Sequence, residues 1–187
     1  MHNMVAIGSR LAIICVVAAL VLGLVNAVTA PVIEENREKD LQEAQAQVVG
    51  DASVGERVDV PEEDHDVVVA YYPVGSDSPP ADRYVVELLG AGYGGDMQIL
   101  AGIRADGEIF AAVLMENSET PGLGKQAEEP EYMESKFVGT GGDDESVPTT
   151  TGDLPEEEAE AVSGATVTFM GIGEALQAGS RFVGEEL

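Results

Sequence analysis

The sequence predicts an α+β protein in which a single N-terminal transmembrane helix is followed by an exported domain with a mainly antiparallel sheet and packed helices. Three observations support this fold class. No charged residue occurs from 11 to 33, four β-rich runs lie between 67 and 116, and the segment after 166 repeats its apolar residues at helical spacing. Apolar periodicity is the main signal for secondary structure in a sequence, so these patterns set the expected order of elements.

The first element is the apolar run that begins LAIICVVAALVLGLVNAV at residue 11. A helix needs about 20 apolar residues to cross a bilayer, so we predict a short tail over 1–10 and a transmembrane helix over 11–30. The alternative is a cleaved signal peptide, because Val28-Thr29-Ala30 offers small residues for a cut. Pro31 would directly follow that cut, and the run is longer than an ordinary signal core, which favours an uncleaved anchor.

The basic residues around this run do not decide its orientation. Arg10 precedes the run, and Arg37 and Lys39 follow it. An excess of Lys and Arg marks the cytoplasmic side, and neither side has a clear excess here. The scarcity of basic residues in the rest of the chain permits export of the large C-terminal part.

The chain after the apolar run is strongly acidic. All 35 acidic residues and eight of the nine basic residues lie from Glu34 onward, which gives this region a formal charge of −27. Such a field repels nucleic acid and anionic lipid, and we expect neither as a partner. The acidic surface is either a solvation surface suited to a saline medium or a docking face for a basic partner.

Few residues are of the types that build common catalytic or metal sites. The only cysteine, Cys15, lies in the apolar run, and His2 and His65 are the only histidines. These counts argue against a disulfide framework, a thiolate cluster and a histidine-based zinc site or triad. We therefore expect no catalytic residue and no metal site.

Residues 31–66 are predicted to form a juxtamembrane helix, which continues from the transmembrane helix, and a linker. Pro31 suits the first turn of a helix, and Gly50 suits its end. Apolar residues recur at helical spacing between them, at Ile33, Leu41, Ala44 and Val48. The acidic segment 51–66 is expected to connect this helix to a domain over 67–187.

The domain begins with four predicted strands. They cover residues 67–72, 83–90, 96–104 and 108–116, each rich in β-branched or aromatic residues. Asp106-Gly107 between the last two strands is typical of a hairpin turn.

Helices and a loop complete the domain. We expect a short helix within 126–138, interrupted or begun at Pro130, and a loop over 139–152. The last helix should cover one face of the sheet with its apolar stripe. That stripe consists of Phe169, Ile172, Leu176 and Phe182.

The stretch SGATVT, residues 163–168, lies at the start of this last helix. Ser163 is predicted to be the N-cap, and Gly164 lets backbone and ligand approach closely. Ala165 and Thr166 would begin the first turn, whose unpaired amides and dipole favour a phosphate. The alternative is an ordinary capped helix without a ligand.

The stretch SETPGLG, residues 118–124, directly follows the fourth strand. Pro121-Gly122 predicts a tight turn, Gly124 frees the backbone again, and Leu123 is displayed by the loop. Such a loop can place its amides and an apolar side chain along a planar ligand, although the same residues also suit a simple turn.

Four segments together resemble a known family, and the resemblance extends over nearly the whole chain. They read VNAVTAPVIEEN, GYGGDMQILAGI, ENSETPGLGK and AVSGATVTFMGIGEAL. This set resembles the FMN-binding G subunit of the Rnf electron-transport complex and, more distantly, the C subunit of the sodium-translocating NADH:quinone reductase. The resemblance implies covalent FMN, with its phosphate esterified to Thr166 by a separate flavin transferase that uses FAD. Thr168 is a second hydroxyl nearby, and Glu160 stands where the family commonly has Asp.

The resemblance also implies the residues around the flavin. Ser163, Gly164 and Ala165 complete the attachment motif, and the GYGG segment over 92–95 would shape the same pocket. The loop would contribute residues near the ring or the ribityl chain: Glu119, Thr120, Gly122, Leu123 and Gly124.

The implied function is that of an electron-carrying flavoprotein subunit in a membrane-bound, ion-translocating ferredoxin:NAD oxidoreductase, with no independent catalytic activity. The other subunits would be its partners, and it would reside in the cell (inner) membrane with the FMN domain on the extracytoplasmic side. Two alternatives stay open: a component like the C subunit of the quinone reductase, and a membrane-anchored acidic binding module without flavin.

Overall fold

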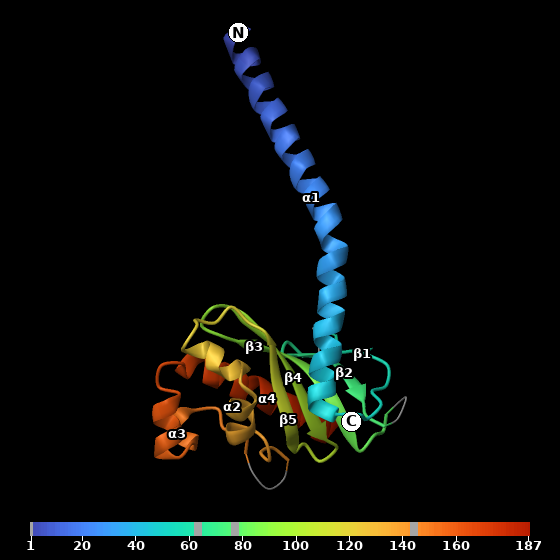
Figure 1. The fold of residues 1–187 in the computed structure, drawn as a ribbon, viewed down its shortest axis with the longest axis vertical. Helices are drawn as coiled ribbons and strands as arrows, with labels where there is room; N and C mark the ends of the chain where they lie inside the picture. Colours follow the sequence, from blue (N-terminus) through green and yellow to red (C-terminus); the bar gives the residue numbers. More distant parts are fainter. Residues whose placement is uncertain (1, 62–64, 76–78, 143–145) are drawn as a thin grey trace. The chain divides into compact units, whose positions relative to one another are not determined.

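The computed structural model describes residues 2–61, 65–75, 79–142 and 146–187 (Figure 1). The chain divides into two compact units, Met1–Leu41 and Gln42–Leu187. The second unit contains a five-stranded antiparallel sheet in the order β1-β2-β3-β4-β5, together with short and long helices. The predicted α+β class is confirmed.

Helix α1, His2–Val49, is continuous through Pro31. The predicted juxtamembrane helix therefore continues from the apolar run, and Pro31 lies inside the helix. Proline removes one backbone donor, and the helix-favouring residues on both sides maintain the helix around that single loss. The end at Gly50 is confirmed, since Gly50 adopts a φ of 63° after the last helical residue. Within the described part of the chain, α1 contains the one helical segment, Arg10–Val49, that is long and apolar enough to cross a membrane.

The last two turns of α1, residues 42–49, belong to the second unit and pack on its sheet. Ala44 and Val48 are buried there. Val48 lies against Gly102 of the fourth strand, where any Cβ would overlap the valine methyl group and the Phe110 ring. The glycine therefore makes room for the helix on this face of the sheet.

All four predicted strands are present, and a fifth occurs inside the predicted connector. The short edge strand β1 pairs with β2 at Val58↔Tyr71, and Arg57 beside it donates to Glu87 at 2.6 Å and to the Tyr72 hydroxyl at 2.9 Å. A strand of two residues is too short to show an alternating pattern in the sequence, so this strand could not be predicted from periodicity. Residues 62–64 of the connector lie outside the described ranges. The strands are β1 Val58–Asp59, β2 Val68–Pro73, β3 Arg83–Ala91, β4 Asp96–Arg104 and β5 Ile109–Glu116.

The predicted hairpin between β4 and β5 is confirmed. Gly107 has a φ of 92°, in the region that favours glycine, and Arg104 N–H donates to Glu108 O at 2.9 Å. Strands β3 and β4 pair in register from Arg83↔Arg104 to Ala91↔Asp96. Two loops, after β3 and after β5, consequently leave the sheet near one end of these strands.

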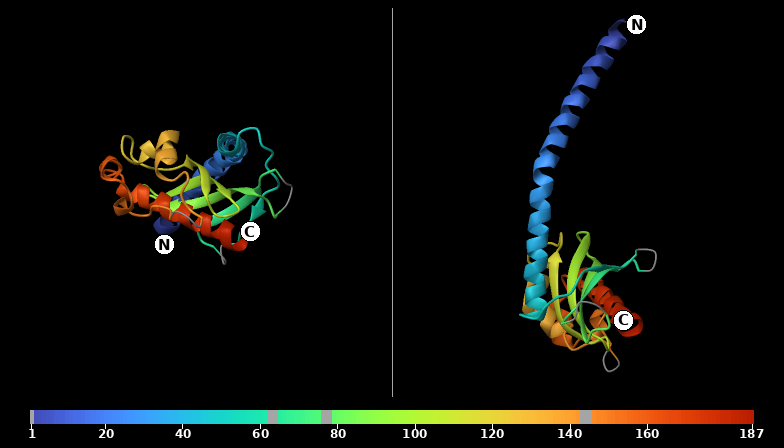
Figure 2. Two further views of the ribbon diagram at one scale, coloured as in Figure 1. Left: turned by 90° about the horizontal axis from the view of Figure 1, so that it is seen from below. Right: turned by 90° about the vertical axis from the view of Figure 1, so that its right-hand side faces the viewer.

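Helix α4, Thr166–Glu186, lies along one face of the sheet (Figure 2). Its predicted apolar stripe is buried, as expected. Glycines bring the helix close to β3, because a Cβ on Gly171 would overlap Ala91 O and one on Gly179 would crowd Leu88. Near its C-terminal end, the buried Ser180 hydroxyl donates to Gly107 O at 2.8 Å.

The remaining short helices connect the sheet to α4. Helix α2 begins at Pro130, as predicted, but the predicted loop over 139–152 runs into a 3-10 turn. A capping box makes that turn: Asp153 accepts from Thr150 N–H at 2.8 Å and from Thr149 N–H at 3.1 Å. Residues 143–145 of the predicted loop are outside the described part. These elements are η1 Gly124–Glu128, α2 Pro130–Lys136, η2 Thr151–Asp153 and α3 Glu156–Ala161.

Candidate functional site

A cavity of about 450 Å³ lies where three segments meet. The segments are the GYGG loop after β3, the SETPGLG loop after β5 and the first turn of α4. All the residues predicted from the two motifs line it except Gly122, which forms the predicted turn next to it with a φ of 78°. Of the GYGG segment, only Tyr93 lines it. The lining residues are Tyr93, Glu119, Thr120, Leu123, Gly124 and the six residues from Ser163 to Thr168.

Helix α4 begins without a side-chain cap. The prediction that Ser163 is the N-cap is wrong, because Ala165 occupies that position. A tight turn, closed by Ala165 N–H to Val162 O at 2.8 Å, leaves Ser163 exposed before the helix start. Phe169 N–H donates to Ala165 O, but no described residue accepts from the three amides of 166–168. These amides and the positive end of the dipole are therefore available to an anion.

The two threonines of this turn have different environments. Thr166 is half-buried, and its Oγ1 makes only long contacts, at 3.3 Å to Ser163 O and 3.4 Å to Val162 O. Thr168 is buried, and its Oγ1 donates to Glu119 Oε2 at 2.6 Å. The Thr166 hydroxyl is thus the reactive candidate, whereas the Thr168 hydroxyl is held by a carboxylate.

The carboxylate of Glu119 lies in the wall of the cavity, with 4% of the residue exposed. Its Oε1 accepts from Gly94 N–H at 2.9 Å, while Oε2 accepts from Thr168. Its backbone N–H donates to Asn117 Oδ1 at 3.0 Å. Both carboxylate oxygens therefore have protein donors, one from the GYGG loop and one from α4.

Glycines make the close packing of these segments possible. A Cβ on Gly92 or Gly124 would overlap the Glu119 carboxylate. A Cβ on Gly164 would lie 2.8 Å from Leu123 Cδ2, so the SETPGLG loop touches the turn before α4. Glycines that were predicted to let a ligand approach the backbone therefore also let other protein atoms approach it.

An apolar rim surrounds the cavity. Tyr93 is 77% exposed, Val167 50% and Leu123 46%, and these are the exposed large apolar residues among the described residues after position 41. Sequence reasoning selected Leu123, included Tyr93 only as part of the GYGG segment, and missed Val167. Tyr93 stands out in retrospect as an aromatic residue between glycines, whereas Val167 between two motif threonines carries no separate signal.

Three polar residues, Asn117, Lys125 and Glu128, are joined beside the SETPGLG loop. Asn117 Nδ2 donates to Glu128 Oε1 at 2.9 Å, and Lys125 Nζ approaches the same oxygen at 3.1 Å. The hydrogen bond from Asn117, followed by that from Lys125, lowers the pKa of Glu128.

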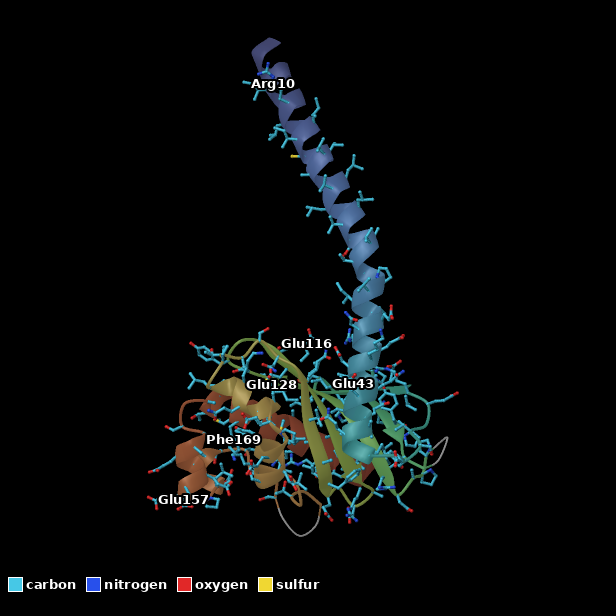
Figure 3. The ribbon with its side chains drawn as sticks, viewed as in Figure 1. Arg10, Glu43, Glu116, Glu128, Glu157 and Phe169 are labelled. Carbon is cyan, nitrogen blue, oxygen red and sulfur yellow. The ribbon has the colours of Figure 1, made fainter. Side chains whose placement is uncertain are left out.

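Glu116 and Glu128 lie near the SETPGLG loop, and Glu157 lies on α3 (Figure 3). Phe169 packs inside the domain.

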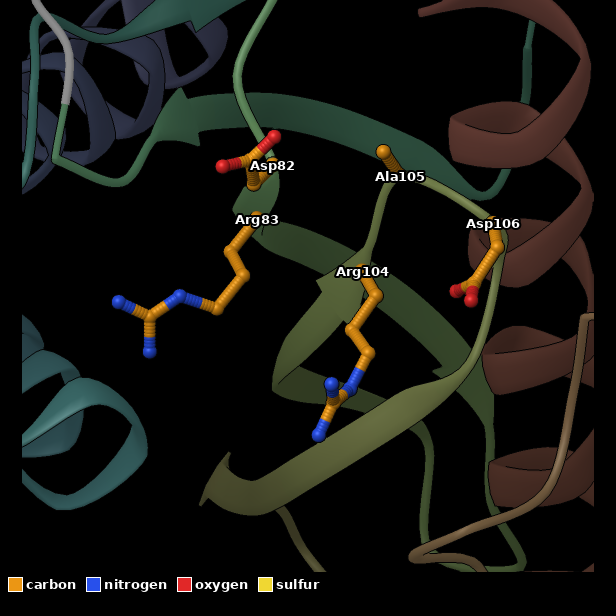
Figure 4. Close-up of a pocket in the computed structure, with 5 residues that line it drawn as sticks. All are labelled: Asp82, Arg83, Arg104, Ala105 and Asp106. Carbon is orange, nitrogen blue, oxygen red and sulfur yellow. The ribbon is translucent and has the colours of Figure 1, made fainter.

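A second cavity of about 450 Å³ lies at the other end of β3 and β4 (Figure 4). Arg83 and Arg104 are direct partners in the β3–β4 register. The Arg83 guanidinium lies 5.8 Å from the Phe110 ring centre, and Arg104 Nε lies 3.5 Å from Glu108 Oε1. The cavity is completed by Asp82, Ala105 and Asp106, all of which lie near the surface.

No group of three or more potential metal ligands occurs among the residues the structure describes.

Two protein families match the chain, one over its N-terminal part and one over its C-terminal part. Residues 92–180 match the FMN-binding domain, and residues 1–48 match the RnfG N-terminal region. The first of these ranges contains all residues that line the first cavity.

Relatives from other organisms are similar over most of the chain. The chain is 32% identical to the G subunit of the Na(+)-translocating ferredoxin:NAD(+) oxidoreductase complex of Acetobacterium woodii, over 87% of this chain and 83% of that protein. It is also 32% identical to the G subunit of the ion-translocating oxidoreductase complex of Methanosarcina acetivorans, over 91% and 89%. The G subunit of the proton-translocating ferredoxin:NAD(+) oxidoreductase complex of Clostridium ljungdahlii is 24% identical over 98% and 95%. The resemblance found in the motifs is confirmed, and the chain belongs to the G-subunit family of the Rnf-type ion-translocating oxidoreductase complexes.

Proposed function

We propose that this chain is the electron-carrying flavoprotein subunit of a membrane-bound, ion-translocating ferredoxin:NAD oxidoreductase, with FMN joined to Thr166 by a phosphoester. One observation carries the assignment of the residue. Inside a domain that matches the FMN-binding family, the Thr166 hydroxyl lies at an uncapped helix start, while the neighbouring Thr168 hydroxyl is bonded to Glu119.

The residues of the first cavity fit FMN in size and chemistry. Its volume of about 450 Å³ is within the range of small-molecule sites. The three free amides at the start of α4 suit a phosphate, and the apolar rim suits a planar ring. Bound FMN would supply one-electron and two-electron transfer, which no side chain of this cavity provides.

Attachment requires a separate flavin transferase with FAD as donor. Thr166 Oγ1 would form a bond to the phosphorus of the FMN moiety, the pyrophosphate bond of FAD would break, and AMP would leave. The hydroxyl proton must go to a base. The two groups that the Thr166 hydroxyl contacts are backbone carbonyls, which are not bases, so the transferase must supply one. Glu160, six residues earlier, is exposed on α3, where a transferase can reach it.

We further propose that the chain is anchored by a single pass over 11–30, with a tail over 1–10, a juxtamembrane segment over 31–66 and the FMN domain over 67–187. The apolar part of α1 supports the anchor. Placement of the FMN domain on the extracytoplasmic side would make covalent attachment useful, because a free cofactor would be lost by dilution there. The other subunits of the complex are the partners, and the acidic domain favours neutral or basic faces on them.

The test is the intact mass of the chain purified from its own membranes, followed by peptide mapping over residues 160–181. We expect the mass of one FMN, less water, on the peptide and its fragments to place it on Thr166. An unmodified peptide in native material would overturn covalent attachment, and a label on Ser163 or Thr168 would overturn the choice of residue.

A further inference from the structure

We propose that Glu119 is a positioning residue that clamps the GYGG loop to the first turn of α4, and so holds the apolar rim and the Thr166 turn in one arrangement. This inference rests on the proposed function of the cavity as the FMN site. It assigns Glu119 to the wall that orders the site, where it acts through Gly94 and Thr168.

The contacts of Glu119 join three segments that are distant in the sequence. One oxygen takes the N–H of Gly94, 25 residues earlier, and the other takes the hydroxyl of Thr168, 49 residues later. No other hydrogen bond among the described residues joins any two of the segments 92–95, 118–124 and 163–168. Within the described part of the chain, Glu119 is therefore the residue that joins these segments by hydrogen bonds.

The surroundings of the carboxylate are shaped to receive it. Gly92 and Gly124 leave the space that its two oxygens occupy, and neither glycine has a positive φ. Alanine is thus compatible with the backbone conformation at both positions, and it is excluded by contact with the carboxylate and its neighbours. A buried carboxylate is costly unless its oxygens are satisfied, and here each oxygen has a donor.

The clamp controls the display of Tyr93. Gly92 N–H donates to Gly95 O at 2.9 Å, which closes the loop, and Gly94 N–H points to Glu119. Tyr93 lies between these two fixed points with its side chain exposed at the cavity. Loss of the Glu119 bond would free this loop from α4.

Two substitutions separate bonding from charge. In Glu119→Gln, the amide oxygen can accept from Gly94 N–H, and the amide nitrogen can donate to Thr168 Oγ1, so both connections persist without the charge. In Glu119→Ala, both connections are lost. A clamp predicts that the glutamine variant retains the arrangement and that the alanine variant does not.

The first measurement is amide hydrogen exchange on the full chain in detergent, produced without the transferase. Glu119→Ala should speed exchange at Gly94 roughly tenfold to a hundredfold, the effect of losing a hydrogen bond to a charged group, while Glu119→Gln stays near the wild type. Ser180→Ala is the matched control, because it removes a buried hydroxyl bond at the other end of α4 and should leave Gly94 unchanged. If Glu119→Ala does not fold, Thr168→Val removes one connection and should still speed exchange at Phe169, whose N–H is bonded to Ala165 O at the start of α4.

The second measurement uses the flavinylated chain. Glu119→Ala should retain the covalent mass and lose most of the visible circular dichroism of the flavin, together with a fall in its fluorescence anisotropy. Wild-type exchange at Gly94 and wild-type dichroism in Glu119→Ala would overturn the clamp, as would equal disruption by glutamine and alanine. If the wild type carries no flavin, the proposed function fails, and the exchange measurement still decides the clamp.

Discussion

The two cavities of the domain have the same volume, about 450 Å³, and opposite character. The cavity beside α4 has a buried carboxylate, free helix amides and an exposed apolar rim. The cavity at the other end of β3 and β4 is lined by exposed arginines and aspartates (Figure 4). Its arginines contact Phe110 and Glu108. Volume alone therefore does not identify the site. Buried polar groups that converge from separate segments identify a binding site better, because the surrounding segments must pack so as to satisfy their hydrogen bonds.

The largest expected difference between the cavities concerns covalent flavin. Thr166→Val should abolish flavin attachment completely, because valine keeps the shape of the side chain and removes the oxygen. Thr168→Val should retain the label on Thr166, and Arg83→Leu at the second cavity should have no effect. Intact mass after expression with a flavin transferase measures all three, and a label in Thr166→Val would contradict the assignment.

The packing around Glu119 should produce the next largest difference. Gly124→Ala would place a Cβ against the carboxylate and 2.7 Å from Thr168 Oγ1, and we expect it to destabilise the domain by about 1–3 kcal/mol. Gly152→Ala is the control, since its nearest contact would be Thr150 Oγ1 at 3.6 Å. Denaturant unfolding of both variants is the measurement. Equal stability of the two would show that the space beside the carboxylate is not constrained.

Acid should loosen the loop of the first cavity by a smaller amount. The pKa of Glu128 is lowered below its ordinary value of 4.5 by the bond from Asn117, so its contribution to stability is present above pH 4.5 and is lost as the pH falls through the lowered value. Its side chain is 44% exposed, which keeps the effect modest. The protection of residues 117–128 against hydrogen exchange, relative to unprotected amides at the same pH, should fall from pH 6 to pH 3. Glu128→Gln should remove this pH dependence of the protection.

The smallest effect is expected at the second cavity. Like charges directly opposite each other in a sheet are unfavourable, but Arg104 is exposed and has Glu108 at 3.5 Å. Arg104→Thr should change the free energy of unfolding by less than about 0.5 kcal/mol and leave the flavin spectrum unchanged. A loss of flavin order in this variant would mean that the two cavities are coupled.

Sequence reasoning succeeded where a pattern repeats or a motif is long. The β-branched and aromatic residues of β2 to β5 and the apolar stripe of α4 were sufficient, because strands favour such residues and a helix packed on a sheet imposes a period on its apolar residues. It failed at β1 and at the predicted N-cap Ser163, which depend on a few contacts and on the geometry of one turn.

The connections of Glu119 could not have been predicted. The motif indicated that Glu119 lies near the ligand, but its bonds to Gly94 and Thr168 join residues 25 and 49 positions away. Such bonds result from how three loops meet in space, and no local pattern encodes them.

Helix α4 is fixed near both ends by buried hydroxyl bonds, from Thr168 to Glu119 and from Ser180 to Gly107. The two hydroxyl-bearing residues are 12 positions apart, which is about 18 Å along a helix. A helix held in this way has little freedom to shift when a charge beside its first turn appears or disappears, because satisfied buried networks are rigid. The reorganisation energy for electron gain and loss at that turn would then come mostly from solvent, and the protein would add little to it.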